Sequence, residues 1–193
     1  MCDVFCRATL QPQRELPDHS DSAQAVEIPA FDGAVLRASF LRGSGADCVM
    51  VLHGIKDSRT GMATYVPMFQ QRAYAVLLPD SRAQRLSGGE YLTYGLLEKS
   101  DVIAWAHWLK QNGCEKVYGL GESLGASILI QAAAAEPAFS AIVAESPYSD
   151  LKTIAQYRVI LMSRLPLWIA SPLAAGIVNT SMVYAKLRYG LNL

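Results

Sequence analysis

Four short runs of consecutive apolar residues divide the chain, and we expect each run to be a strand buried on both faces. Three stretches with apolar residues at helical spacing lie between them, at 60–73, 95–111 and 124–135. Strands that alternate with helices predict an α/β fold, a three-layer sandwich on a mostly parallel sheet. The predicted strands are 48–52, 73–78, 116–120 and 139–144.

The first part of the chain has a different pattern. Residues 1–24 are polar and irregular, which is typical of a poorly ordered lead-in. Two strand-like runs then flank Asp32-Gly33, a dipeptide that favours a hairpin turn. We therefore expect the folded core to span 25–150. The two strand-like runs are 26–28 and 34–40.

The composition indicates one globular domain. Of the 193 residues 51% are hydrophobic, enough for a sizeable core. The formal net charge is zero, whereas nucleic-acid-binding domains normally carry a basic surplus, so no nucleic-acid partner is expected. No apolar stretch of a signal peptide occurs in the first sixteen residues, which favours the cytoplasm without fixing the compartment.

The cysteines predict neither a metal site nor a disulfide. None lies in a C-x-x-C pair or in a Cys/His cluster with zinc-like spacing. A domain of this size does not need a disulfide framework, so we expect free thiols in core or loop positions. No metal and no cofactor is predicted. The cysteines are Cys2, Cys6, Cys48 and Cys114.

A G-x-S-x-G pattern at residues 121–125 marks the candidate chemistry, with Ser123 at its centre. An apolar strand is predicted before it and a helix after it, as a nucleophile elbow requires. Such a turn forces the serine into a strained conformation, and its neighbours Gly121 and Gly125 must be small because they crowd the strand and the helix. Glu122 completes the motif. An ordinary glycine-flanked turn or a phosphate-binding turn is the alternative, and neither needs this pair of small residues.

Five motifs in chain order resemble the α/β-hydrolase superfamily, nearest to its serine-aminopeptidase and bacterial esterase-like branches. The resemblance covers residues 26–193. The chain departs from the superfamily's pattern at Gln84-Arg85, in the loop beside the pocket, where relatives often have a His-Gly step. The motifs are His53-Gly54, Pro79-Asp80-Ser81-Arg82, Ser87-Gly88-Gly89-Glu90, Gly121-Glu122-Ser123-Leu124-Gly125 and Glu145-Ser146-Pro147-Tyr148.

The resemblance implies roles for the groups around the serine. A His-Gly step after the first buried strand, here His53-Gly54, opens the loop that binds an oxyanion in the superfamily. The backbone N–H groups of Ile55 and Leu124 would be the two donors. His53 itself would fix this loop through hydrogen bonds rather than act as a base. The expected partner is a small-molecule ester or peptide substrate.

The resemblance also implies a triad that the chain does not supply. The acid and the histidine follow the serine in the superfamily, whereas His19, His53 and His107 all precede Ser123. Asp150 is the only plausible acid, in a position used by a minority of relatives. We therefore expect a sheet that is incomplete at its C-terminal edge, in a fragment of a longer protein that is inactive as it stands.

Residues 151–193 contain cations but no acids, and within them the stretch 159–185 is apolar. The resemblance makes them a truncated helical cap over the pocket. A membrane span over 159–185 is the alternative, against which Arg164, Pro166 and Pro172 argue. The excess of positive charge predicts a weak contact with an anionic membrane surface. The cations are Lys152, Arg158, Arg164, Lys186 and Arg188.

Two functions therefore compete. The first is a serine hydrolase that cleaves carboxylic esters or small amides through an acyl-serine intermediate. The second is a non-catalytic pseudohydrolase, a binding module that keeps the pocket and has lost the triad. The intact Ser123 between paired glycines favours the enzyme, because a binding module has no need of a strained turn.

Overall fold

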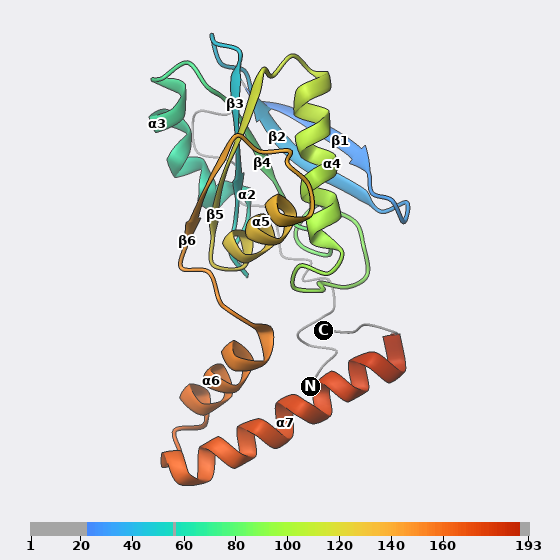
Figure 1. Ribbon diagram of the computed structural model, residues 1–193, viewed down its shortest axis with the longest axis vertical. Helices are drawn as coiled ribbons and strands as arrows, with labels where there is room; N and C mark the ends of the chain where they lie inside the picture. Colours follow the sequence, from blue (N-terminus) through green and yellow to red (C-terminus); the bar gives the residue numbers. More distant parts are fainter. Residues whose placement is uncertain (1–22, 56, 190–193) are drawn as a thin grey trace. The chain divides into compact units, whose positions relative to one another are not determined.

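One six-stranded sheet forms the centre of the computed structural model, which describes residues 23–55 and 57–189 (Figure 1). The strands are β1 Ala23–Pro29, β2 Val35–Leu41, β3 Asp47–Leu52, β4 Ala75–Pro79, β5 Lys116–Glu122 and β6 Ala141–Glu145. Their order across the sheet is β1-β2-β4-β3-β5-β6. The first two strands form an antiparallel hairpin that pairs antiparallel with β4, and the other four run parallel. The mostly parallel sheet predicted from the apolar runs is confirmed.

Helices cover both faces of this sheet (Figure 1). They are α2 Arg59–Met62, the 3-10 helix η2 Ala63–Tyr65, α3 Val66–Gln70, α4 Glu98–Gln111 and α5 Leu124–Ala135. Successive residues of β5 point to opposite faces. Leu120 joins a hydrophobic cluster with Val66 of α3, whereas a Cβ atom added to Gly119 would lie 2.7 Å from Leu129 of α5. The sheet is therefore the middle of three layers.

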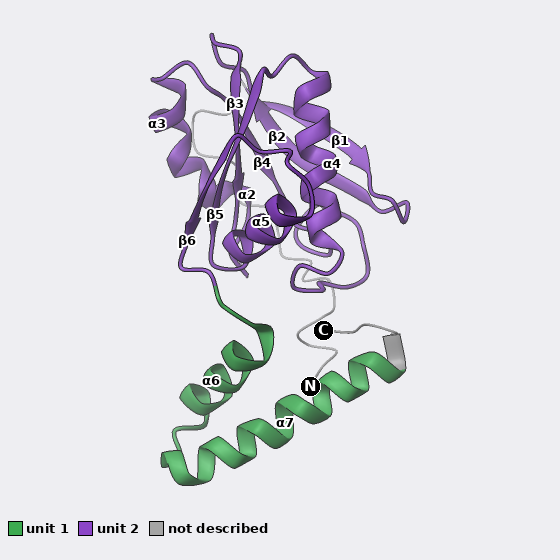
Figure 2. Ribbon diagram, in the orientation of Figure 1, with its two compact units in different colours: residues 1–6, 148–193 green, residues 7–147 purple. Residues whose placement is uncertain are grey.

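The chain divides into two compact units (Figure 2). The larger comprises residues 7–147 and contains the sheet, and the smaller comprises residues 1–6 and 148–193. The described part of the smaller unit contains two helices, α6 Leu151–Ser163 and α7 Leu167–Tyr189. Helix α6 ends where Arg164 adopts a left-handed conformation with φ 55°, which reverses the chain direction before α7 begins.

The prediction of one bent helix over 60–73 is wrong. Three short helical segments, α2, η2 and α3, occupy this stretch instead. Pro67 lies in the first turn of α3, where its missing N–H costs no hydrogen bond, so it fits the start of a new helix. Ala73, with φ 68°, then turns the chain into β4, which begins at Ala75 rather than at 73.

Strand β1 begins at Ala23, inside the stretch predicted to be an irregular lead-in. Its pairing with β2 extends to Ala23 opposite Leu41, and these ladder hydrogen bonds keep the polar start of the strand extended. The rest of the predicted lead-in, together with Cys2, Cys6 and His19, lies outside the described residues.

Cys48 and Cys114 form a disulfide, so the prediction of free thiols is wrong for this pair. Cys48 lies near the start of β3, and Cys114 lies two residues before β5. These two strands are neighbours, with Cys48 opposite Val117, which brings the two Cα atoms to 5.7 Å. The pairing depends on the order of strands in the sheet and has no signature in the spacing of the cysteines.

Replacing both cysteines by alanine should lower the free energy of unfolding by about 2–4 kcal/mol, because the disulfide restricts the unfolded chain. Denaturant unfolding without reductant measures the difference. Addition of reductant is the control, since it should destabilise the parent protein and leave the Cys48→Ala/Cys114→Ala variant unchanged. Equal stability of the two proteins without reductant would mean that the thiols are not joined.

Candidate active site

Ser123 occupies the turn between β5 and α5, at the carboxyl edge of the parallel strands. Its backbone angles, φ 52° and ψ −109°, lie outside the regions that non-glycine residues normally adopt. Its N–H donates to the carbonyl oxygen of Glu145 at 2.8 Å, and its own carbonyl accepts from the N–H of Ser127 at 3.1 Å. The surrounding strand and helix therefore hold this residue in a strained conformation, with its side chain partly exposed.

The two glycines of the motif lie where no side chain fits. A Cβ atom on Gly121 would lie 2.6 Å from the nitrogen of Ala126, and one on Gly125 would lie 2.5 Å from the carbonyl oxygen of Leu52. Both obstacles are backbone atoms, which cannot move aside as a flexible side chain can. The absence of side chains lets the start of α5 pack directly against β5 and the end of β3.

The His53-Gly54 loop lies against this turn. A Cβ atom added to Gly54 would be 3.4 Å from the Cβ atom of Ser123 and 3.5 Å from the carbonyl oxygen of Glu122. Strands β3 and β5 pair up to Leu52 opposite Gly121, so the loops that follow them leave the sheet side by side. The two predicted motifs, about 70 residues apart in the chain, thus meet at one edge of the sheet.

His53 is fully buried and both of its ring nitrogens are engaged. Nε2 accepts a hydrogen bond from the N–H of Ser81 at 3.0 Å, and Nδ1–H therefore donates to the carbonyl oxygen of Gly54 at 2.8 Å. Burial lowers the pKa of His53, which keeps the ring neutral. The ring ties the loop after β3 to the loop after β4, and it has no free lone pair with which to take a proton from Ser123.

Protein stability should decrease as pH falls below about 6.5, the ordinary pKa of histidine. Since the folded pKa of His53 is lowered, the unfolded state binds a proton there before the folded state does. The free energy of unfolding then drops by up to about 1.4 kcal/mol per pH unit until the folded pKa is reached. Urea unfolding between about pH 5 and 8 measures this slope.

Two variants test whether His53 causes this dependence of stability on pH: His53→Gln and, as its matched control, His107→Gln. His107 lies on α4, is half exposed and contacts Glu136, so its replacement should leave most of the slope in place. His53→Gln should flatten it. An unchanged slope in His53→Gln would show that other groups cause the pH dependence.

The two predicted oxyanion donors lie on the two loops that meet at Ser123. Leu124 is the first residue of α5, where a backbone N–H has no acceptor within the helix. Ile55 follows Gly54 directly and is partly exposed. Their shared role as donors stays a prediction, which the contact between Gly54 and Ser123 favours.

Three polar side chains lie beside this turn, and of these only Tyr65 was not part of a predicted motif. Glu122 and Glu145 end the paired strands β5 and β6 in register, and the hydroxyl of Tyr65 donates to Oε2 of Glu145 at 3.2 Å. Burial, followed by the charge of Glu145, raises the pKa of Tyr65, so the phenol keeps its proton. Glu122 and Glu145 belong to two of the motifs found in the sequence, whereas no pattern in the sequence pointed to Tyr65.

The motif Pro79-Asp80-Ser81-Arg82 supports the loops around the Ser123 turn rather than the turn itself. Asp80 is buried and accepts from the N–H groups of Arg59 and Leu86. The buried guanidinium of Arg82 donates twice to Asp101 of α4, at 2.6 and 2.7 Å, and once to Asp32 at 2.8 Å. These contacts join the β1–β2 hairpin, the loop after β4 and α4.

Asp150 caps helix α6. Its Oδ1 accepts from the N–H of Thr153 at 2.8 Å, and hydrogen bonds from Thr153 hold the pKa of Asp150 below its usual value. It belongs to the smaller unit, so its role as a triad acid stays a prediction. The described residues contain no group of three or more His, Cys, Asp or Glu side chains that could hold a metal ion.

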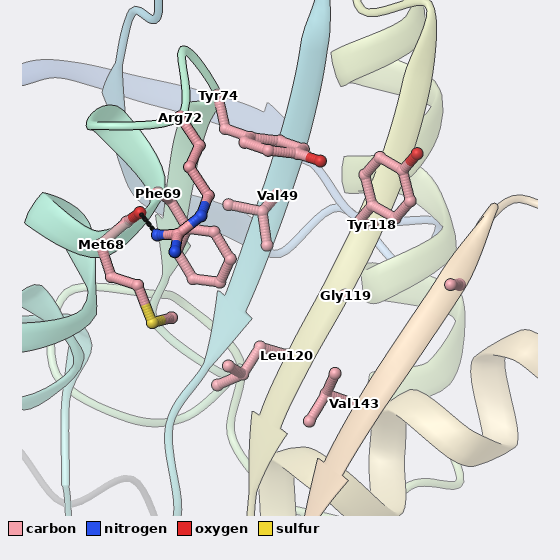
Figure 3. A pocket seen from close by; sticks show the side chains of 10 residues that line it. Val49, Met68, Phe69, Arg72, Tyr74, Tyr118, Gly119, Leu120 and Val143 are labelled. Atoms are coloured by element: carbon pink, nitrogen blue, oxygen red, sulfur yellow. Dashed lines mark hydrogen bonds between the residues drawn. The ribbon is translucent and has the colours of Figure 1, made fainter.

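An apolar groove of about 260 Å³ lies along the sheet face next to α3 (Figure 3). Leu120 and Tyr118 of β5 line it together with Val143 of β6, and Phe69 borders it from α3. Neither Ser123 nor any acidic or histidine side chain is among the lining residues. The groove is therefore separate from the serine turn.

Two sequence comparisons bear on this arrangement. The family model described as X-Pro dipeptidyl-peptidase (S15 family) matches residues 10–186. The uncharacterized protein YqkD of Bacillus subtilis is 28% identical over 130 residues, which make up 65% of this chain and 43% of YqkD. The chain thus spans less than half the length of this curated relative.

The described structure is similar to several solved hydrolases. An esterase of Pyrococcus furiosus shares 26% sequence identity and a TM-score of 0.76, over 86% of this chain and 66% of the esterase. The α/β hydrolase GrgF from Penicillium sp. sh18 has a TM-score of 0.63 at 21% identity, over 88% of this chain and 67% of GrgF. The second likeness concerns the fold alone.

Proposed function

Because the chain belongs to the X-Pro dipeptidyl-peptidase (S15) family of α/β hydrolases, we propose that it is a serine hydrolase acting through Ser123. Its substrates would be carboxylic esters or small amides, short peptides included. The hydrolase family and the Pyrococcus esterase support the general class of reaction. The observation that carries the proposal is the strained backbone of Ser123, at the carboxyl edge of the sheet and in contact with the loop of Gly54.

In the proposed reaction the Ser123 oxygen attacks the carbonyl carbon of the substrate and loses its proton to a base. The carbonyl oxygen becomes an oxyanion, which the N–H groups of Leu124 and Ile55 would bind. The start of α5 adds the positive end of its helix dipole. Collapse of this intermediate expels the alcohol or amine and leaves an acyl-Ser123 ester, which water then hydrolyses.

No base for this reaction is evident among the residues that the structure describes. No histidine follows Ser123 in the sequence, and both nitrogens of His53 are already bonded. We propose that residues 1–193 by themselves bind the oxyanion but activate the serine poorly. Among the possible substrates, activated esters should lose the least hydrolysis rate, because a nitrophenolate leaves without a proton whereas an amine must be protonated. The same lack of a base keeps the non-catalytic binding module as the second candidate.

Labelling with a fluorophosphonate probe, followed by peptide mass spectrometry, tests the enzyme proposal. We expect slow phosphonylation of Ser123, accelerated by added imidazole, which can act as the missing base. Ser123→Ala should abolish labelling in this peptide. Ser140→Ala, at an exposed serine before β6, is the matched control and should label normally. No labelling of Ser123 with or without imidazole would instead favour the binding module.

A further inference from the structure

The two helices of the smaller unit expose an unusual number of large apolar side chains. Among residues 167–187 of helix α7, the buried positions form one stripe and are alanine or valine: Ala170, Ala174, Val178 and Ala185. The large side chains lie off this stripe, with Trp168 79% and Leu187 82% exposed. The exposed apolar residues from Tyr157 onward are Tyr157, Leu161, Met162, Leu165, Leu167, Trp168, Ile169, Leu173, Val183, Tyr184 and Leu187.

These apolar side chains are not confined to one side of the helix. Leu167, Trp168 and Ile169 are consecutive, so their side chains leave α7 about 100° apart. One flat protein surface, such as the pocket rim that a cap would cover, can bury only some of these side chains, because they point in different directions around the helix axis. A helix that sinks into the boundary between lipid headgroups and acyl chains buries more of it.

The charge of the segment is complementary to one kind of surface. Residues 151–193 contain five cations and no acid. Lys152 and Arg158 are exposed on α6, Arg164 is exposed in the turn, and Lys186 is exposed near the end of α7. The exposed aromatic residues Trp168 and Tyr157 are types that collect at the membrane–water interface. Cations beside exposed apolar and aromatic side chains match an anionic bilayer surface.

A span across the bilayer fits α7 less well than a position on its surface. The stretch Leu167–Leu187 has 21 residues and a mean hydropathy of 1.2, which is sufficient for a span by length and composition alone. However, Asn179 and Thr180 are exposed in its second half, and Pro172 removes one backbone donor near its start. A span would place both side chains in the hydrocarbon core, whereas a helix at the interface keeps them within reach of the hydrated lipid headgroups.

We propose that α6 and α7 bind the surface of an anionic lipid bilayer and so place the domain at a membrane. The exposed apolar side chains of α7 enter the interface, and Lys152, Arg158, Arg164 and Lys186 contact the lipid headgroups. This inference is independent of the chemistry at Ser123, because none of these residues belongs to the serine turn.

Flotation of residues 1–193 with lipid vesicles tests this proposal. We expect binding to vesicles of phosphatidylcholine with phosphatidylglycerol, loss of binding at high salt, and little binding to phosphatidylcholine alone. Lys152→Gln/Arg158→Gln should weaken partitioning roughly 25-fold, about fivefold for each cation. Lys110→Gln/Lys116→Gln removes two exposed cations from the larger unit and is the matched control. It should change partitioning less than about twofold.

Lipid contact by α7 can be measured separately. Brominated phosphatidylcholine in the anionic vesicles should quench the fluorescence of Trp168 and leave that of the buried Trp105 unaffected. Trp168→Phe should therefore abolish the quenching without loss of flotation.

Four results would overturn the proposal. The first is no flotation with anionic vesicles, and the second is an equal loss of vesicle binding in Lys152→Gln/Arg158→Gln and in its control. The third is bound protein that resists extraction by alkaline carbonate. The fourth is a protein that does not bind vesicles and forms a dimer that Trp168→Ser disperses. The third would mean that α7 spans the bilayer, and the fourth that a second copy of the chain covers the apolar surface.

Discussion

The polypeptide of residues 1–193 should hydrolyse p-nitrophenyl acetate no more than about 10³–10⁴ times faster than water alone, which is several orders of magnitude below a serine hydrolase whose serine is activated by a base. A serine hydroxyl is a weak nucleophile unless a base takes its proton. His53 cannot take it, because its Nε2 lone pair accepts from the N–H of Ser81. The initial rate of nitrophenolate release measures the effect.

Ser123→Ala is the control for this rate. Without a base, the substitution should reduce the remaining activity by less than about tenfold, since most of that activity comes from the oxyanion donors and substrate binding. Rapid turnover that disappears in Ser123→Ala would show that a base within the 193 residues serves Ser123.

Gly125→Ala should destabilise the larger unit by about 3 kcal/mol, at the upper end of the usual cost of overpacking. The added methyl group would lie 2.5 Å from the carbonyl oxygen of Leu52 and 2.7 Å from that of His53. Relief requires a shift of α5 away from β3, which also displaces Ser123 from Gly54. Denaturant unfolding gives the loss of stability, and fluorophosphonate labelling gives the accompanying loss of reactivity.

Gly176→Ala provides the matched control. Gly176 lies inside helix α7, where a Cβ atom would meet nothing within 4 Å. Alanine should therefore stabilise this helix by up to about 1 kcal/mol, because it lowers the conformational entropy of the unfolded chain. A similar effect of both substitutions would mean that the close contact at Gly125 is not formed.

The elements that the sequence predicted well are those with a strong local signal. Strands β3, β4 and β5 follow from uninterrupted apolar runs, which a sheet covered on both faces can bury. The fourth run also forms a strand, β6, but the prediction that it is buried on both faces is wrong, because β6 lies at the edge of the sheet and Val143 is 60% exposed. Helix α5 has the predicted bounds, Leu124–Ala135, because the motif fixes its start and Pro137 prevents its continuation. The contact between the loops of Gly54 and Ser123 follows from the rule that parallel strands place their carboxyl ends at one edge.

The features that the sequence did not reveal depend on strand order and register. The Cys48–Cys114 disulfide joins residues 66 apart that meet because β3 and β5 are neighbours. The hydrogen bond from Tyr65 to Glu145 spans 80 residues and requires η2 to lie over the end of β6. The prediction of one helix over 60–73 was wrong for a local reason, because the same spacing of apolar residues fits both a continuous helix and three short helical segments.

The structure of the phosphonylated protein would test the role of Ser123 most directly. After reaction with a fluorophosphonate in the presence of imidazole, the phosphorus should be bonded to the Ser123 oxygen. One phosphonyl oxygen should lie about 2.7–3.1 Å from both the Leu124 and the Ile55 nitrogens, the distance of an oxyanion from its donors. A phosphonyl group on another residue, or one on Ser123 whose oxygens contact neither nitrogen, would contradict the proposed site.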